Sequence, residues 1–133
     1  MLIDNRLLDE VTMKAKESPR LRMNYNLHDS FDSKAQRLFN AMEPGTIVPI
    51  QRHQNTDETM ILIRGKMKVF LHDMYGNVTN SVLVSPDNGV FGVHIKKGQW
   101  HSVEVLESGT VMFEVKEGPY APLSNEDIIE NMK

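Results

Sequence analysis

Residues 45–65, GTIVPIQRHQNTDETMILIRG, carry three side chains at spacings that let them converge on one metal ion. Gln51 and His53 stand two positions apart in an apolar run, so a β-strand would direct both side chains to the same face. Glu58 follows the polar residues 54–57, which we expect to form a short loop. That loop would return Glu58 to the side of His53, and the stretch therefore predicts two strands with polar ligands where they meet.

A second histidine stands in Gly98-Gln99-Trp100-His101, at the start of another strand-like run. Imidazole nitrogens and carboxylate oxygens suit divalent first-row metals. A buried carboxylate would be costly without a cation to offset its charge. We therefore expect His53, Glu58 and His101 to bind a divalent metal ion, and the ligand types do not distinguish Fe, Mn, Zn and Ni.

Gln51 allows two interpretations. Its neutral amide oxygen could ligate the metal as a weaker donor than imidazole, or it could hydrogen-bond a metal-bound water. In the second case, two histidines and one glutamate have the composition of a facial triad, with open positions for substrate or O₂. Either way, we expect a weaker or a more open site than one with a histidine at this position.

Short runs rich in β-branched, aromatic and other apolar residues follow one another along the chain. Turn signals such as Tyr75-Gly76-Asn77 and Pro86-Asp87-Asn88-Gly89 separate them. This pattern predicts an all-β sandwich or barrel. The expected strands are residues 36–42, 46–50, 59–64, 66–72, 78–84, 90–96, 101–106 and 110–116. Helical periodicity fits residues 36–42 nearly as well.

A short helix is expected at each end of the chain. Residues 4–17 have helical spacing of apolar side chains, with Asp4 as N-cap and Pro19 ending the helix. Ser124 and Asp127 form a capping-box pattern that predicts a second helix, which would carry Ile128, Ile129 and Met132.

Composition narrows the class of protein. The 133 residues predict one domain, and 15 basic against 18 acidic residues give a net charge of −3 without a basic block, which argues against nucleic acid as a partner. No apolar run approaches the roughly 18 residues that span a bilayer. The N-terminus lacks a signal-peptide pattern and the chain has no cysteine, so we expect a cytoplasmic protein that is not bound to a membrane. Without cysteine, any metal has to be held by N and O ligands.

The first ligand stretch resembles the first motif of the cupin family. That motif is a Gly, five residues, His-x-His, three or four residues, Glu, six residues and Gly. Every spacing is kept by Gly45, Gln51, His53, Glu58 and Gly65, with Gln51 in place of the first histidine.

The second cupin motif, Pro-x-Gly-x-x-His, keeps Gly98 and His101 but has Lys96 instead of proline. Within the cupins, the chain is similar to the small WbuC-type metalloproteins found with bacterial surface-polysaccharide genes. The segments that carry this resemblance are residues 26–28, 36–38, 40–42, 49–53, 98–101 and 114–120.

The resemblance implies a single cupin domain over residues 1–133, with a double-stranded β-helix, or jelly-roll barrel. Its parts would be an N-terminal helix and lead-in at 1–30, the barrel at 35–116, and a tail with a helix at 117–133. Cupins commonly pair through their sheets, so the resemblance also implies a homodimer.

Two classes of function follow. The first is a metal-dependent enzyme acting on a sugar or another small polar molecule, with an oxygenase as a variant. The second is a binding module that holds a small molecule, with a saccharide as the expected ligand, and performs no chemistry; the departures at Gln51 and Lys96 favour it. A purely structural domain would leave Glu58 without a reason.

Two further side chains are candidates for an acid or a base. Tyr120 follows Gly118-Pro119 and could donate a proton or contact substrate, although a packing role fits as well. His28 lies with Asn26 in LRMNYNLHDS, where a loop is the default expectation. The family resemblance raises His28 and Asn26 to candidate pocket residues.

Overall fold

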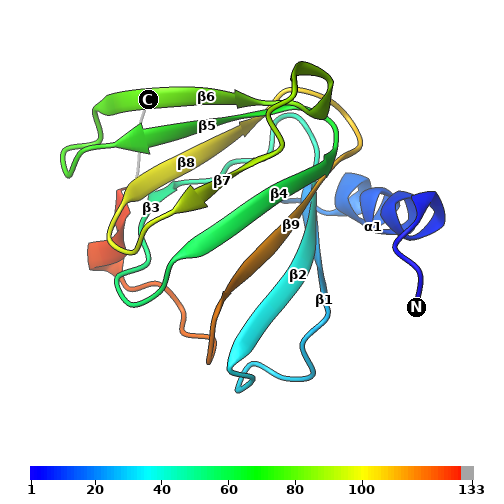
Figure 1. Ribbon diagram of the computed structural model, residues 1–133, viewed down its shortest axis with the longest axis horizontal. Helices are drawn as coiled ribbons and strands as arrows, with labels where there is room; N and C mark the ends of the chain where they lie inside the picture. Colours follow the sequence, from blue (N-terminus) through cyan, green and yellow to red (C-terminus); the bar gives the residue numbers. More distant parts are fainter. Residues whose placement is uncertain (130–133) are drawn as a thin grey trace.

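Two antiparallel β-sheets and one helix make up the part of the chain, residues 1–129, that the computed structural model describes (Figure 1). The first sheet has the order β1 (Arg22–Asn26), β2 (Ala35–Met42), β9 (Thr110–Glu117), β4 (Glu58–Arg64), β7 (Gly92–Ile95). The second has the order β10 (Ile128–Ile129), β3 (Ile50–Gln51), β8 (Trp100–Val105), β5 (Met67–His72), β6 (Val78–Val84). Two 3₁₀ turns, η1 (Pro86–Asn88) and η2 (Asn125–Asp127), lie in the connections.

The two sheets pack face to face around one apolar core. Side chains alternate along each strand, so every second residue points between the sheets. Both sheets contribute to the core: Met42, Met60, Leu62, Ile95 and Met112 from the first, and Met67, Val69, Val84, Val103 and Val105 from the second. The sequence pattern therefore gives a sandwich, as expected for an all-β chain.

The inner face of the first sheet changes from apolar to charged along its length. Between β4 and β9, the register pairs Leu62 with Met112, then Met60 with Glu114, and finally Glu58 with Lys116. The first pair belongs to the apolar core, whereas the third is an acid opposite a base. The space between the sheets is consequently an apolar core at one end and a polar cavity at the other.

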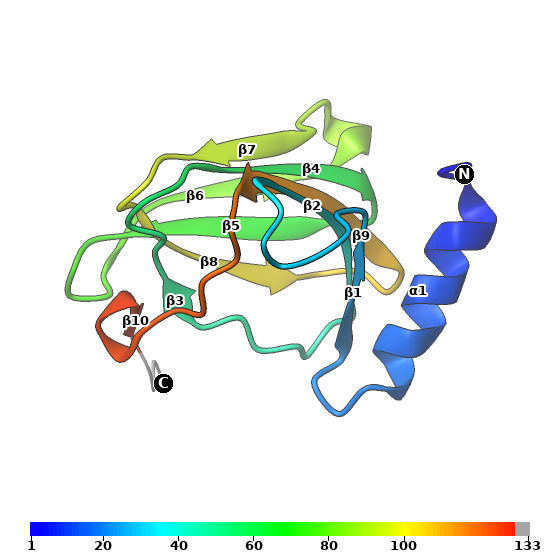
Figure 2. The same cartoon turned by 90° about the horizontal axis from the view of Figure 1, so that it is seen from below.

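Helix α1 (Asn5–Glu17) covers the outer face of the first sheet (Figures 1 and 2). Asp4 caps it as predicted, because its carboxylate accepts a hydrogen bond from the Leu7 amide at 3.1 Å. The apolar side of the helix packs on the outward residues of β2 and β9, and each fully buried aliphatic side chain contributes about 1.5–3 kcal/mol. This second core contains Leu7, Leu8, Val11, Ala15, Phe39, Ala41 and Val111.

Both ends of seven of the eight predicted strands lie within two residues of the observed strand ends. Residues 36–42, for which helical periodicity fits nearly as well, belong to strand β2. The prediction at residues 46–50 was wrong, since only Ile50 of that run is in a strand, β3. β1 was not expected. The pairings within residues 1–129 define two separate sheets, so the predicted closed barrel is not seen.

The predicted C-terminal helix was wrong over the residues that the structure describes. Ser124 does donate to Asp127, at 3.1 Å, but the chain makes only the 3₁₀ turn η2 and then extends into β10. Ile128 and Ile129 pair with β3 instead of continuing a helix. Met132 lies outside the described residues. No helix in the described range is long and apolar enough to cross a membrane.

Candidate metal centre

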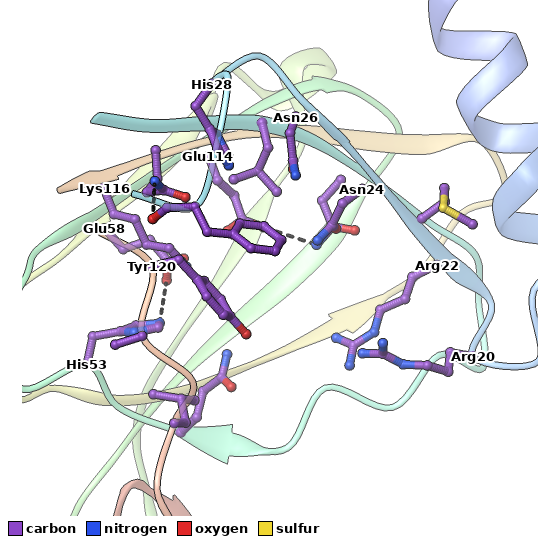
Figure 3. Close-up of a pocket in the computed structure, with 18 of the residues that line it drawn as sticks. Arg20, Arg22, Asn24, Asn26, His28, His53, Glu58, Glu114, Lys116 and Tyr120 are labelled. Carbon is purple, nitrogen blue, oxygen red and sulfur yellow. Dashed lines mark hydrogen bonds and ion pairs between the residues drawn. The ribbon is translucent and has the colours of Figure 1, made fainter. Parts of the chain in front are cut away.

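His53, Glu58 and His101 come together at the polar end of the sandwich, as the sequence predicted. One ligand atom from each lies within 4.8 Å of the others. Glu58 Oε1 is 3.8 Å from His53 Nε2 and 3.2 Å from His101 Nε2. Glu58 and His101 are buried, and His53 is half-buried. Figure 3 shows His53 and Glu58 facing each other across the cavity wall.

Strand pairing explains why these side chains meet. β3 pairs with β8 so that Gln51 lies opposite His101. The loop after β3 is tied to the turn before β8, because the Gly98 amide donates to the His53 carbonyl at 2.7 Å. Glu58 is the first residue of β4 in the other sheet. The site therefore bridges the two sheets.

Hydrogen bonding fixes the direction of the His101 lone pair. His101 Nδ1 lies 2.9 Å from the Gln99 carbonyl oxygen, which can only accept, so Nδ1 carries the proton. In the neutral ring, Nε2 then has a lone pair 3.2 Å from Glu58 Oε1. Two acceptors that face each other in a buried site repel unless a cation lies between them.

Three buried atoms at this point have no hydrogen-bond partner within residues 1–129: His53 Nε2, Glu58 Oε1 and His101 Nε2. Buried polar groups are otherwise almost always paired. Two imidazoles and one carboxylate form a donor set that suits a divalent first-row metal. The residues present therefore fit the metal ion that the motif spacing predicted.

The charge state of the acids also suits a cation. Burial alone would raise the pKa of Glu58, but a hydrogen bond from His101 when its ring is protonated, the contact with Glu114 and the charge of Lys116 outweigh burial and lower this pKa to about 2. Lys116 Nζ lies 3.9 Å from Glu58 Oε2. Burial, together with the neighbouring Glu58 charge, raises the pKa of Glu114 to about 8. At neutral pH, Glu58 is ionised and Glu114 holds a proton.

The pKa of His53 is lowered from its ordinary value, chiefly because burial disfavours the charged imidazolium. The charge of Glu58 raises this pKa, whereas the charges of Lys116 and His101 lower it further. A neutral imidazole is the form that ligates a metal. His53 is thus ready to bind at neutral pH.

A cavity of about 490 Å³ opens beside the three ligands. Gln51, His28 and Tyr120 line it together with His53 and Glu58, so it brings the predicted catalytic candidates to the same space (Figure 3). A volume of this size is typical of small-molecule sites. The lining includes charged and amide side chains, which suit a polar ligand.

His28 and Tyr120 stand on the wall of this cavity that β1 and the C-terminal segment form. His28 Nδ1 lies 3.0 Å from the Arg37 carbonyl oxygen and 3.1 Å from the Arg37 amide nitrogen, so it can donate to the first or accept from the second, and the proton of the neutral ring is then on Nδ1 or on Nε2. This Nε2 is buried and has no partner within residues 1–129. The Tyr120 ring packs against Phe31 with a centroid distance of 4.9 Å, and Tyr120 is about half exposed. Both side chains could contact a ligand.

Several other arginine, histidine and tryptophan side chains do not line the cavity. Arg52 pairs with Asp127 at 3.0 Å. The Arg52 guanidinium also stacks over Trp100, 4.7 Å from the ring centroid. Trp100 is not among the residues that line the cavity. His72 and His94 hydrogen-bond to side chains of neighbouring strands.

Sequence reasoning missed Glu114 and Asn40 as site residues. Asn40 Nδ2 donates to Glu114 Oε1 at 3.0 Å, and both side chains are buried in the cavity wall. The available signal was alternation: Glu114 shares a strand face with Met112, a core residue, and so has to point inward.

Comparison with solved structures identifies the fold. The chain matches the cupin domain of Cnp3 from Schizosaccharomyces pombe with a TM-score of 0.56 and 10% identity, over 72% of this chain and 59% of that one. It matches KdgF from Halomonas sp. with a TM-score of 0.62 and 12% identity, over 78% and 84%. At this level of identity, the likeness shows the fold alone, a cupin fold.

The capsular polysaccharide assembling protein CapF from Staphylococcus aureus is also similar, with a TM-score of 0.57 and 21% identity. The match covers 75% of this chain but only 28% of the CapF chain. No curated protein matches the sequence. A family model matches residues 3–84, more than half of the chain, and the protein belongs to that family, described as a domain of unknown function, DUF6016.

Proposed function

We propose that this chain is a cupin-fold metal-binding protein of the WbuC type, and that His53, Glu58 and His101 hold a divalent metal ion. The observation that carries the proposal is the convergence of three buried nitrogen and oxygen atoms without hydrogen-bond partners in residues 1–129. Gln99 and Glu114 would act behind the ligands, since one fixes the His101 tautomer and the other contacts Glu58.

We further propose that the site acts on a sugar or another small polar molecule. A bound metal would act as a Lewis acid on a carbonyl or hydroxyl oxygen of that molecule. His28 Nε2, which has no partner within residues 1–129, could donate or accept a hydrogen bond in the cavity, and the Tyr120 hydroxyl could hold or move a proton at its rim. The saccharide assignment is supported by the polar lining and by the names of similar structures, among them a polysaccharide assembling protein.

Elemental analysis of the purified protein tests the metal site. We expect near-stoichiometric divalent metal in the wild type and its loss in His101→Ala and Glu58→Gln. Gln51→His should raise metal affinity, because an imidazole is a stronger donor than an amide oxygen. Equal, near-zero metal in the wild type and in Gln51→His would contradict the proposal.

A second candidate function is a binding module with a weakened metal site and no catalysis. Gln51 favours it, because loss of a strong ligand is tolerated where chemistry is not required. A saccharide that raises the melting temperature and is recovered unchanged after long incubation with metal-loaded protein would support this function. Conversion of the ligand would support the enzyme.

The homodimer and the cytoplasmic location stay predictions. Size-exclusion chromatography with light scattering tests the first, with a mass near twice the chain's 15.2 kDa expected. A mass equal to one chain at micromolar concentration would contradict it.

A further inference from the structure

Two arginines stand at the end of the cavity opposite the candidate metal ligands. Arg20 and Arg22 both line the cavity, and Figure 3 shows their guanidinium groups directed into it, across from His53 and Glu58. The pKa of Arg22 is lowered, chiefly by burial and also by the nearby charge of Arg20. The charge of Glu114 acts in the opposite direction. Two like charges are thus held together inside one pocket.

Neither arginine has an ionic partner within residues 1–129. The ion pairs there, at up to 4.0 Å, involve other basic residues. Arg22 Nε is buried and has no hydrogen-bond partner in the part of the chain that the structure describes. A guanidinium stays charged at any physiological pH, and a buried donor without a partner is costly. Arg22 therefore has a buried donor for which the described part of the chain supplies no anion, and Arg20, which is exposed at the cavity, has no ionic partner there either.

The backbone holds the arginine pair in place. Leu21, between the two arginines, has a positive φ of 57°, which costs a residue with a Cβ about 1–2 kcal/mol. Two contacts fix this conformation: Thr46 Oγ1 donates to the Arg20 carbonyl at 2.7 Å, and the Glu43 amide donates to the Leu21 carbonyl at 2.9 Å. These contacts hold the backbone on both sides of Leu21, and with it the positions from which Arg20 and Arg22 reach the cavity.

We propose that Arg20 and Arg22 bind the phosphoryl group of a small polyhydroxylated ligand, such as a monosaccharide phosphate, whose other end faces His53, Glu58 and His101. Planar guanidinium forks match phosphate oxygens, and a phosphoryl group carries close to the two negative charges that would balance both arginines. Asn24 and Asn26 line the cavity between the ends and offer amide donors and acceptors for hydroxyl groups. The cavity of about 490 Å³ is large enough for such a ligand.

The phosphoryl site can be tested separately from the metal site, although the orientation of the ligand rests on the proposed function. Calorimetric titrations with inorganic phosphate and with glucose 6-phosphate, in the presence of a chelator, avoid direct binding of phosphate to metal. We expect both probes to bind the wild type, with glucose 6-phosphate at least as tight as phosphate. Arg20→Gln and Arg22→Gln should weaken both by roughly 10-fold to 100-fold, the effect of one charged hydrogen-bonding group.

Arg6→Gln is the matched control, because Arg6 is exposed on α1, outside the cavity lining, and its loss changes the net charge equally. Arg22→Lys keeps the charge but not the fork and should give an intermediate loss. No phosphate binding by the wild type, equal binding by all the arginine variants, or an equal loss in Arg6→Gln would overturn the proposal. Glucuronate that binds as tightly as glucose 6-phosphate would overturn the phosphoryl assignment.

His101→Ala separates this proposal from the metal site. If the variant loses metal but keeps phosphate affinity, both proposals are supported. Phosphate binding by a wild-type protein that never takes up metal would refute the metal site alone. Full metal occupancy without phosphate binding would refute the arginine site alone.

Discussion

Replacing Glu114 with glutamine should change how the stability of the metal-free protein depends on pH. The Glu114 side chain is buried, accepts a hydrogen bond from Asn40 at 3.0 Å and contacts the ionised Glu58. Glutamine has almost the same shape, can accept from Asn40 and can donate to Glu58. The substitution therefore removes the titration while retaining the contacts.

The sign follows from the direction of the pKa shift. The pKa of Glu114 is raised from 4.5 to about 8 in the folded protein, so the folded state binds a proton that the unfolded state has released. This contribution to stability is fully present below pH 4.5 and is lost as pH rises through 8. Each pH unit well between these values costs about 1.4 kcal/mol, and the cost per unit falls as pH approaches 8, which gives a loss of roughly 3–4 kcal/mol from pH 5 to pH 8.

Urea denaturation in the presence of a chelator, at pH values from 5 to 8, measures the effect. The lowered pKa of His53 makes stability fall as pH drops below 6.5, the opposite of the effect of Glu114. This His53 effect is the same in both proteins, so the difference between their stabilities isolates Glu114. Glu114→Gln should gain roughly 3–4 kcal/mol relative to the wild type over this range. Glu104→Gln, at an exposed strand position, is the control and should follow the wild type. Parallel curves for the wild type and Glu114→Gln would refute a protonated, buried Glu114.

Three further predictions concern the metal site and the fold. Metal affinity should fall at acidic pH with a midpoint below 6.5, because burial lowers the pKa of His53 and only the neutral ring ligates; a midpoint above 6.5 in metal titrations would contradict this. Divalent metal at 100 times its Kd should raise the melting temperature of the wild type by about 10 °C and leave His101→Ala unchanged, and an equal rise in both would exclude His101 as a ligand. Gly65→Ala should lower the free energy of unfolding by about 3 kcal/mol, because φ is +98° and the new Cβ would lie 2.6 Å from Thr110 Cα. Gly89→Ala, with φ +76° and open space around the new Cβ, should lower it by about 1 kcal/mol in the same urea assay.

Strand positions followed from alternation wherever one face of the strand packs in the core. β5 is an example, since Met67 and Val69 point inward and Lys68 points outward. The same rule could not find β1, because its inward residues include Arg22 and Asn24, which line the polar cavity. A strand that faces a polar site loses the hydrophobic period by which strands are recognised.

The candidate metal ligands were predictable because they lie close together in sequence or in a spaced motif. The residues that contact them, such as Glu114, were not predictable. Glu114 is a charged residue in a strand, and charge alone suggests a solvent-facing position. Its partner Asn40 is 74 residues away. The C-terminal error has a similar cause: the contact of Ser124 with Asp127 formed, but the strand partner of Ile128 lies at Gln51, far away in sequence.

The division of the sandwich into an apolar end and a polar end has a consequence for how this protein can evolve or be redesigned. Stability is concentrated in side chains such as Leu62 and Met112, while the candidate ligand Glu58 and its neighbour Lys116 lie farther along the same two strands. Substitutions at the polar end should therefore leave the packing that folds the chain largely undisturbed. The set of candidate ligands can then be changed one residue at a time, and Gln51→His is the first such change to make.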